Sequence, residues 1–206
     1  AYTESYGDGN RYTNAFANGN RYAHTSTDGN RHTNACTNGY ACANTPSYWQ
    51  LLIQNGDFEQ GSDPWQESSA AGYEIVDTTN PHSGQYSAYL CGYGGCSDSI
   101  GQDFTVPNNA TKITVSYWWY GYTNRHSSSC RDAFNATLLD SNGNAVKKLQ
   151  HACNTDATSS WKQVSFDVTN LSNYGGQTVT LVFSAKTANT TVTTAFFVDD
   201  VVVSAS

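Results

Sequence analysis

The sequence predicts an all-β protein: a sandwich of two antiparallel sheets, preceded by an irregular N-terminal tail. Three observations support this prediction. From residue 51 onward, short runs of β-branched and aromatic residues alternate with clusters of Gly, Asn, Asp and Ser. No stretch shows a sustained period of 3.6 residues, which a helix would need. Within several runs the apolar residues occupy alternate positions, as in strands that cover a core with one face.

Nine candidate strands follow from these runs, and turn signals separate them. In chain order the strands are expected at 51–54, 73–76, 86–91, 99–106, 112–120, 133–139, 162–167, 178–184 and 195–203. The turn signals include Asn80-Pro81, Pro107-Asn108 and Ser141-Asn142-Gly143-Asn144. Many short strands that are separated by turns at regular intervals are typical of a sandwich.

The run 112–120 shows the clearest alternation. One face would carry the set that is expected in the core, namely Ile113, Val115, Tyr117 and Trp119. Trp118 and Tyr120 are left on the opposite face, beside small polar residues.

Residues 1–49 are expected to be a low-complexity tail or linker, and residues 50–206 the β-sandwich module. In residues 1–48 every odd position is Ala, Thr, Ser, Gly or Arg, and nearly every even one is Tyr, Asn, Asp or His. This period of two offers no apolar face to bury. Asp-Gly-Asn triplets could suggest calcium loops, but they lack the ligand at the twelfth position.

The genetic code accounts for the alternation better. Codons for Tyr, Asn, Asp and His have A in the middle, whereas those for Ala and Thr have C. Read one base out of frame, the tract becomes a Pro/Thr linker, which is a stiff spacer between secreted modules. We hypothesise a one-base frameshift near codons 50 and 51, which resequencing the DNA would test. The alternative is a genuine repeat that happens to alternate.

Composition restricts the possible partners. The formal net charge is −7, only 13% of residues are charged, and aromatic residues also make up 13%. Because no basic stripe exists, nucleic acid and membrane surfaces are not expected partners. The chain lacks Met and starts at Ala1. We therefore expect a piece of a secreted polypeptide that is tethered to an upstream domain and exported by a signal outside this sequence.

Six cysteines occur, none in a CxxC pair, which disfavours zinc or thioredoxin-like chemistry and favours disulfides. Cys91 and Cys96 flank a Gly-rich loop that is flexible enough to close a short bridge. Cys130 and Cys153 could join the ends of neighbouring strands. Four cysteines allow three pairings, so the sequence does not fix the connectivity. Free buried thiols are the alternative.

Three motifs, in this order, carry a resemblance to a known fold. They are Asn55-Gly56-Asp57-Phe58-Glu59 followed by Trp65, then Pro81-His82-Ser83-Gly84-Gln85-Tyr86-Ser87-Ala88, and finally Phe196-Phe197-Val198-Asp199-Asp200-Val201. They resemble the opening, an internal strand and the last strand of galactose-binding-like jelly rolls, the fold of several families of carbohydrate-binding module. The resemblance covers residues 50–206 and implies a jelly-roll β-sandwich. The run Tyr117-Trp118-Trp119-Tyr120 and the paired cysteines are similar to those of modules appended to secreted bacterial peptidases and glycosidases.

The resemblance also implies a structural calcium ion where the first and last strands meet. Calcium prefers six to eight oxygen ligands. Carboxylates would come from Asp57, Glu59, Asp199 and Asp200, and backbone carbonyls near Ser83 could complete the shell. The alternative is that these acids end strands and face water.

The expected ligand is a polysaccharide or other glycan. Trp118, Tyr120 and Tyr122 could form an aromatic platform for sugar rings. The polar side chains expected beside it, on a strand assumed to be a neighbour, are Arg131, Asp132 and Asn135. Alternatively, Trp118 and Tyr120 are core residues covered by a loop.

Catalysis finds little support in the sequence. The histidines lack a nearby nucleophile motif, and no HExxH occurs. We therefore expect a non-catalytic, extracellular binding module, most simply a carbohydrate-binding accessory to a secreted enzyme. The alternative is a protein-interaction or structural module of a secreted peptidase or cell-surface protein.

Overall fold

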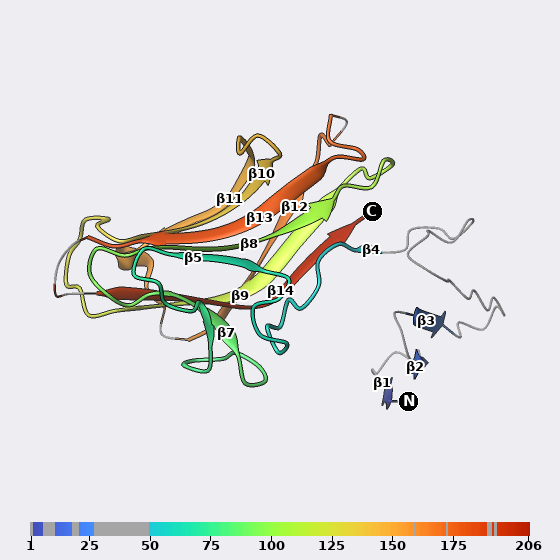
Figure 1. The fold of residues 1–206 in the computed structure, drawn as a ribbon, viewed down its shortest axis with the longest axis horizontal. Coiled ribbons are helices and arrows are strands. Elements are labelled where there is room, and N and C mark those ends of the chain that lie inside the picture. Colours follow the sequence, from blue (N-terminus) through green and yellow to red (C-terminus); the bar gives the residue numbers. More distant parts are fainter. Residues whose placement is uncertain are drawn as a thin grey trace. The chain divides into compact units, whose positions relative to one another are not determined.

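A computed structural model describes residues 2–5, 11–17, 21–26, 50–158, 160–171, 173–188, 191 and 193–206. The chain divides into two units, Ala1–Tyr48 and Trp49–Ser206. In the first unit, the described residues form an antiparallel sheet of β1 (Tyr2–Ser5), β2 (Arg11–Ala17) and β3 (Arg21–Ser26) (Figure 1). These three segments are strands where the sequence suggested irregular chain, since a period of two is compatible with pairing even without an apolar face.

The second unit contains two antiparallel sheets, which lie one above the other in Figure 1. The β10 sheet has the order β11-β10-β13-β8-β5. Its strands are β5 (Gln66–Ser69), β8 (Ser97–Thr105), β10 (Ala133–Asp140), β11 (Ala145–Cys153) and β13 (Thr178–Lys186). The β9 sheet has the order β12-β9-β14-β7-β6, and β4 pairs with β14. Its strands are β4 (Gln50–Leu51), β6 (Val76–Asp77), β7 (Ser87–Cys91), β9 (Ile113–Thr123), β12 (Lys162–Val168) and β14 (Thr194–Ala205).

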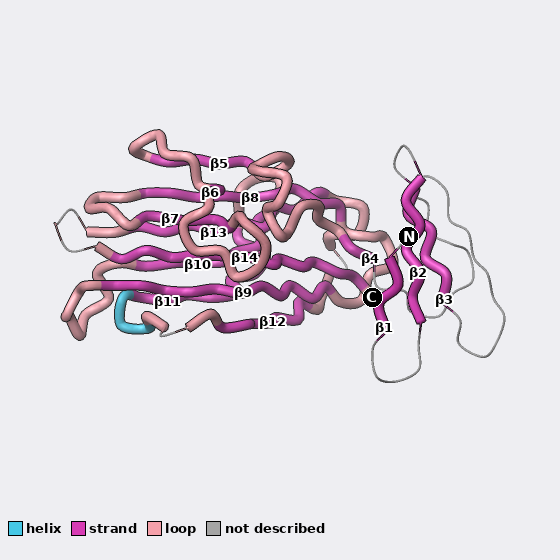
Figure 2. Tube along the Cα trace, turned by 90° about the horizontal axis from the view of Figure 1, so that it is seen from below, coloured by secondary structure: helices cyan, strands magenta, loops and turns pink. Residues whose placement is uncertain are grey.

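The strands of the two sheets run in the same general direction (Figure 2), as in aligned sheet packing. The described part of this unit contains one short helical turn, η1 (Asn154–Asp156), after β11. The predicted sandwich of two antiparallel sheets is therefore confirmed.

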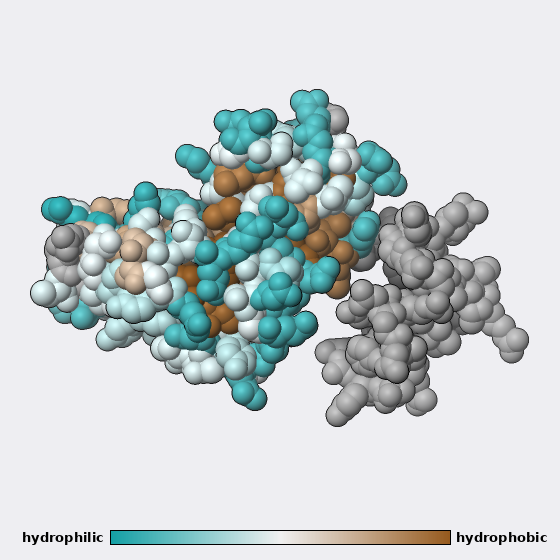
Figure 3. Space-filling view, in the orientation of Figure 1, coloured by the Kyte–Doolittle hydropathy of each residue, from teal (hydrophilic) through white to brown (hydrophobic). Residues whose placement is uncertain are grey.

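The core lies between the two sheets. Ile113, Val115, Tyr117 and Trp119 of β9 are all buried, as their alternation predicts. Phe134 of β10 lies at the centre, with ring centroids 5.6 Å from Phe196 and 6.1 Å from both Trp119 and Phe183. With the sheets seen edge-on, hydrophobic residues show between hydrophilic ones in the middle of the unit (Figure 3). Truncating one such buried phenylalanine costs about 3–5 kcal/mol in a well-packed core.

Two strands of the β10 sheet are not among the predicted ones, and both lie at its edges. β5 contains no apolar residue, and β11 interrupts its alternation at Lys147 and Lys148. The pairing of β10 with β11 shifts register twice, between Ala136 and Thr137 and between Leu138 and Leu139. The predicted strands 51–54 and 73–76 each shrink to a two-residue strand.

Candidate functional site

The outer face of the β9 sheet carries a line of aromatic side chains, which we call the aromatic row: Trp161, Tyr120, Phe197 and Tyr89. Register places Phe197 of β14 between Tyr120 of β9 and Tyr89 of β7. Trp161 directly precedes β12, next to the pairing of Lys162 with Trp119. Successive ring centroids are 6.0, 5.8 and 4.7 Å apart. Four separate chain segments thus build one aromatic surface.

The rings of the aromatic row are buried to different degrees. Phe197 is 5% exposed, whereas Tyr89, Tyr120 and Trp161 are half-buried and keep part of their rings at the surface. Gly92 has φ +88°, and a Cβ there would lie 2.0 Å from the Tyr89 hydroxyl, so this position requires glycine. Burial raises the pKa of Tyr89, and the charges of Asp77 and Asp98 raise it further. Its hydroxyl therefore remains a hydrogen-bond donor at ordinary pH.

Trp118 is on the predicted outer face of β9, but a neighbour covers part of it. The His82 ring stacks on Trp118 with centroids 3.9 Å apart and an interplanar angle of 17°. His82 also meets Trp161 edge-on at 5.5 Å. This histidine is fixed by a 2.6 Å contact between its Nδ1 and Oδ2 of Asp200. His82 therefore covers one face of the Trp118 ring.

The structure corrects the assumed neighbourhood of the polar residues. β9 pairs with β12 and β14, whereas β10 pairs with β11 and β13 in the opposite sheet. Asn135 of β10 therefore lies on a different face from Tyr120, and its Oδ1 contacts His151 Nδ1 at 2.8 Å. Arg131 is exposed in the segment that precedes β10. Tyr122 remains on the outer face of β9 and is 55% exposed.

Asp132 has a structural role and is not available to contact a ligand. Its side chain is fully buried, and its Oδ2 accepts hydrogen bonds from Arg125 Nε at 2.9 Å and Thr194 Oγ1 at 2.6 Å. Its Oδ1 accepts a hydrogen bond from Ala188 N at 2.9 Å. The net effect of these donors holds the pKa of Asp132 below its usual value, even though burial, the largest influence, acts in the opposite direction.

The acidic residues predicted to bind calcium meet the 82–86 segment. Glu59 Oε1 accepts hydrogen bonds from the backbone N–H groups of Gln85 and Tyr86, at 2.7 and 2.8 Å. Asp57 is exposed two residues before it. Gly84 has φ +57°, and a Cβ there would lie 2.3 Å from Glu59 Oε1. Glycine is therefore required where this carboxylate approaches the turn.

Asp199 and Asp200 hold the same segment from the last strand. Asp199 is fully buried, and its Oδ2 accepts hydrogen bonds from the N–H groups of His82 and Ser83 at 2.8 and 3.1 Å. Ser83 Oγ donates to Asp200 Oδ1 at 2.8 Å. Burial raises the pKa of Asp199 to about 6, and the charge of Asp200 adds to this effect while three backbone N–H groups oppose it. A nearby cation would favour the ionised form of this carboxyl.

One buried atom near these acids has no hydrogen-bond partner. Ser87 Oγ is buried and is the one atom of this kind without a hydrogen-bond partner among the described residues. Val198 pairs with Ala88, so Ser87 comes next to Asp199 along the ladder, on the outer face. Among the described residues, however, no three of the acids Asp57, Glu59, Asp199 and Asp200 come close enough together to form a metal-binding group, so calcium at this place stays a prediction.

Both expected disulfides are present. Cys91 pairs with Cys96, and Cys130 pairs with Cys153. The first closes the Gly-rich loop between β7 and β8, and the second joins the segment before β10 to the end of β11.

Sequence reasoning missed three members of the aromatic row, Trp161, Phe197 and Tyr89. A signal for one was available: in Phe196-Phe197 consecutive strand residues point to opposite faces, so one ring had to leave the core. The other two residues gave no such signal. Trp161 precedes β12, so the alternation within that strand does not include it, and Tyr89 is flanked by buried residues.

No protein family and no curated protein matches this amino-acid sequence. Solved structures, in contrast, match its fold. A carbohydrate-binding module of family 61 in complex with β-1,4-galactotriose is similar at 18% identity, over 75% of this chain and 97% of that one, with a TM-score of 0.52. A family 16 carbohydrate-binding module is 22% identical, over 74% and 98%, with a TM-score of 0.49. A xylan-binding domain of family 22 from Paenibacillus barcinonensis is 15% identical, over 78% and 97%, with a TM-score of 0.49. On the first of these likenesses, residues 50–206 share the jelly-roll fold of a carbohydrate-binding module.

Proposed function

We propose that this chain is a non-catalytic carbohydrate-binding module and that sugar rings stack on the partly exposed rings of the aromatic row, Tyr89, Tyr120 and Trp161. The carrying observation is the row itself, in which four chain segments place Trp161, Tyr120, Phe197 and Tyr89 side by side on one outer sheet face. A sugar ring has an apolar C–H face and a polar rim, so it pairs with an aromatic floor and flanking hydrogen-bonding groups.

Polar groups flank the row where such a ligand needs them. Gln163 of β12 is exposed and lies opposite Trp118 in the ladder, next to the row. The Tyr89 hydroxyl lies at the other end of the row. These groups would orient a ligand, while the rings would supply most of the buried area.

The acids are better explained by structure than by catalysis. Asp199 and Asp200 accept hydrogen bonds from His82 and Ser83, so these acids fix the position of the 82–86 segment. Calcium, when bound by Glu59 and Asp199, would clamp the 82–86 segment to the first and last strands and so hold His82 against Trp118. This role is structural and needs no redox or acid–base chemistry.

The disulfides and the composition support a secreted setting. Two disulfides persist in oxidising compartments, and the chain is poor in charged residues. Among the residues that the structure describes, no helix is long and apolar enough to cross a membrane. As an accessory to an enzyme on the same polypeptide, the module would raise the local concentration of substrate around that enzyme.

The test is retention of the protein on insoluble polysaccharides and on a glycan array. Tyr120→Ala and Trp161→Ala should each weaken binding by about 2 kcal/mol, roughly thirtyfold, because each removes one ring of the platform. Tyr73→Ala is the matched control, since Tyr73 is 61% exposed and packs on Tyr93, which is not a member of the row.

Equal loss in all three variants would contradict the assignment of the site. No retention of the wild-type protein on any glycan would overturn carbohydrate binding and favour a protein-interaction module.

A further inference from the structure

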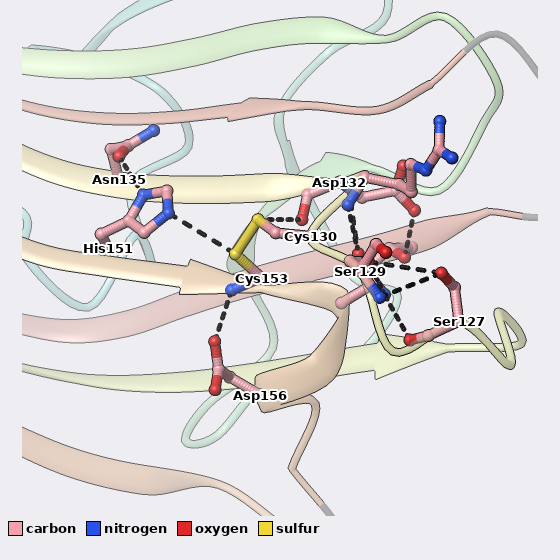
Figure 4. Close-up of a disulfide and its surroundings, with 11 residues drawn as sticks. Ser127, Ser129, Cys130, Asp132, Asn135, His151, Cys153 and Asp156 are labelled. Atoms are coloured by element: carbon pink, nitrogen blue, oxygen red, sulfur yellow. Dashed lines mark hydrogen bonds between the residues drawn. A yellow bond between two sulfur atoms is a disulfide. The ribbon is translucent and has the colours of Figure 1, made fainter.

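The Cys130–Cys153 disulfide has an imidazole beside it. His151 lies two residues before Cys153 on β11, and its Nε2 is 3.5 Å from Cys153 Sγ (Figure 4). Cys130 is exposed, whereas Cys153 is buried. Because Cys130 is the more exposed residue of the pair, we expect an external thiolate to attack Cys130 Sγ, so that the sulfur that leaves is the one next to the histidine.

The histidine is oriented for a metal ligand. Its Nδ1 lies 2.8 Å from Asn135 Oδ1, which can only accept a hydrogen bond. Nδ1 therefore carries the proton in the neutral ring, and the lone pair of Nε2 points toward the sulfur. Histidines that bind metals usually donate their second N–H to such an acceptor, which fixes the tautomer and the ring orientation.

The other disulfide lacks this arrangement. Cys91 and Cys96 are both buried, at 5% and 3% exposure. Their neighbour Asp98 is also buried and accepts hydrogen bonds from Cys91 N and from the Tyr93 hydroxyl. An external thiolate is thus hindered from reaching this pair, which makes it an internal control.

The segment around Cys130 has hydrogen bonds that do not depend on the disulfide. Asn154 Oδ1 accepts hydrogen bonds from the N–H groups of Arg131 and Asp132, at 2.8 and 3.1 Å. Asn154 Nδ2 donates to the carbonyls of Ser127 and Ser129, at 3.3 and 3.2 Å. These bonds should keep the two sulfurs near each other after reduction.

We propose that Cys130–Cys153 is an exchangeable disulfide whose reduced form binds a thiophilic divalent cation such as Zn²⁺ through Cys130 Sγ, Cys153 Sγ and His151 Nε2. These three atoms lie within 4.8 Å of one another. Ligand atoms around one tetrahedral zinc ion are about 3.6 Å apart, so small side-chain rotations would suffice. Three protein ligands leave the fourth position open for water or an external ligand.

A dithiol can reduce the Cys130–Cys153 disulfide in two exchange steps. Its thiolate attacks Cys130 Sγ to form a mixed disulfide, and Cys153 leaves as a thiolate. The second thiol of the reductant then displaces Cys130, so that the reductant ends as a disulfide and the protein gains two electrons and two protons. On metal binding both thiols release their protons to water.

Differential alkylation tests the first part. The full chain is treated with dithiothreitol in graded amounts, free thiols are alkylated, and each cysteine is located by mass spectrometry. Cys130 and Cys153 should be modified at reductant levels that leave Cys91 and Cys96 paired. Reduction of Cys91–Cys96 first, or of both pairs together, would overturn the proposal.

Cobalt binding tests the second part, because Co²⁺ bound by thiolates shows sulfur-to-metal charge-transfer bands. The partly reduced protein, with dithiothreitol removed under nitrogen, should show these bands at one Co²⁺ per chain, and Zn²⁺ should abolish them. The oxidised protein should show none. His151→Asn should weaken Co²⁺ binding at least tenfold, whereas the matched variant His126→Asn should not.

Tryptophan fluorescence is followed throughout to check that the chain stays folded. Absence of the bands, bands indifferent to His151→Asn, or binding only by unfolded chain would each overturn the metal site.

Discussion

Raising the pH from 4 to 7 in metal-free buffer should destabilise the folded module through Asp199. This side chain is fully buried, and burial raises its pKa from the ordinary 3.8 to about 6. The groups around it are Asp200, whose charge acts in the same direction, and His82, which is bonded to Asp200. The folded state therefore holds a proton that the unfolded chain has already lost over this interval.

The sign and size follow from linkage. Because the folded pKa lies above the unfolded one, the stabilising contribution is fully present below about pH 4 and disappears as the pH rises through about 6. A difference of about two units, at about 1.4 kcal/mol each, corresponds to roughly 3 kcal/mol of unfolding free energy. Asp132, whose pKa is lowered, acts in the opposite direction and only below about pH 4.

The assay is urea unfolding followed by tryptophan fluorescence at several pH values in EDTA, with Asp199→Asn as the reference. The variant places an amide donor against backbone N–H groups, so its absolute stability should fall. The quantity to compare is the slope with pH, which the wild type should have and the variant should lack.

Two outcomes would decide the matter. Equal slopes for the wild type and Asp199→Asn between pH 4 and 7 would refute the reasoning. With calcium in place of EDTA the slope should flatten, because a bound cation favours the ionised carboxylate.

Two further predictions concern stability. EDTA should lower the melting temperature by several degrees, since calcium at a hundredfold excess over its dissociation constant contributes about 2.7 kcal/mol, and Glu59→Gln should remove most of that dependence. Melting of demonstrably metal-free protein that is indifferent to added calcium would contradict the clamp. Asp132→Ala should lower the unfolding free energy by about 3 kcal/mol, because Arg125, Thr194 and the N–H of Ala188 lose a buried acceptor. Chemical denaturation measures this, and a loss below about 1 kcal/mol would contradict the structural role.

The interior of the sandwich could be predicted because it depends on local alternation. In β9, large apolar side chains at every second position fix which face is buried, and a shift by one residue would expose all of them. The edge strands β5 and β11 could not be found in this way. These two strands form because they pair with β8 and β10, whereas few of their own side chains are buried.

The assumed pairing of β9 with β10 shows where local patterns mislead. The two strands are consecutive, and consecutive strands often pair. Nine residues separate Thr123 from Ala133, however, which is longer than the usual hairpin loop of two to five residues. The chain uses this length to cross from one sheet to the other, and Asp132 is buried at the point where it enters the second sheet.

The aromatic row shows why a binding surface on a sheet is harder to predict than its core. A core position needs only the right periodicity within its own strand, whereas the row depends on the register between strands that are far apart in the chain. Tyr89, Tyr120 and Phe197 align only because β14 lies between β7 and β9, with Phe197 opposite both tyrosines. A register slip of one residue on either side would place a core residue opposite Phe197. The sequence could therefore identify Tyr120 as an outward ring, but the continuous surface follows from the pairing of the strands.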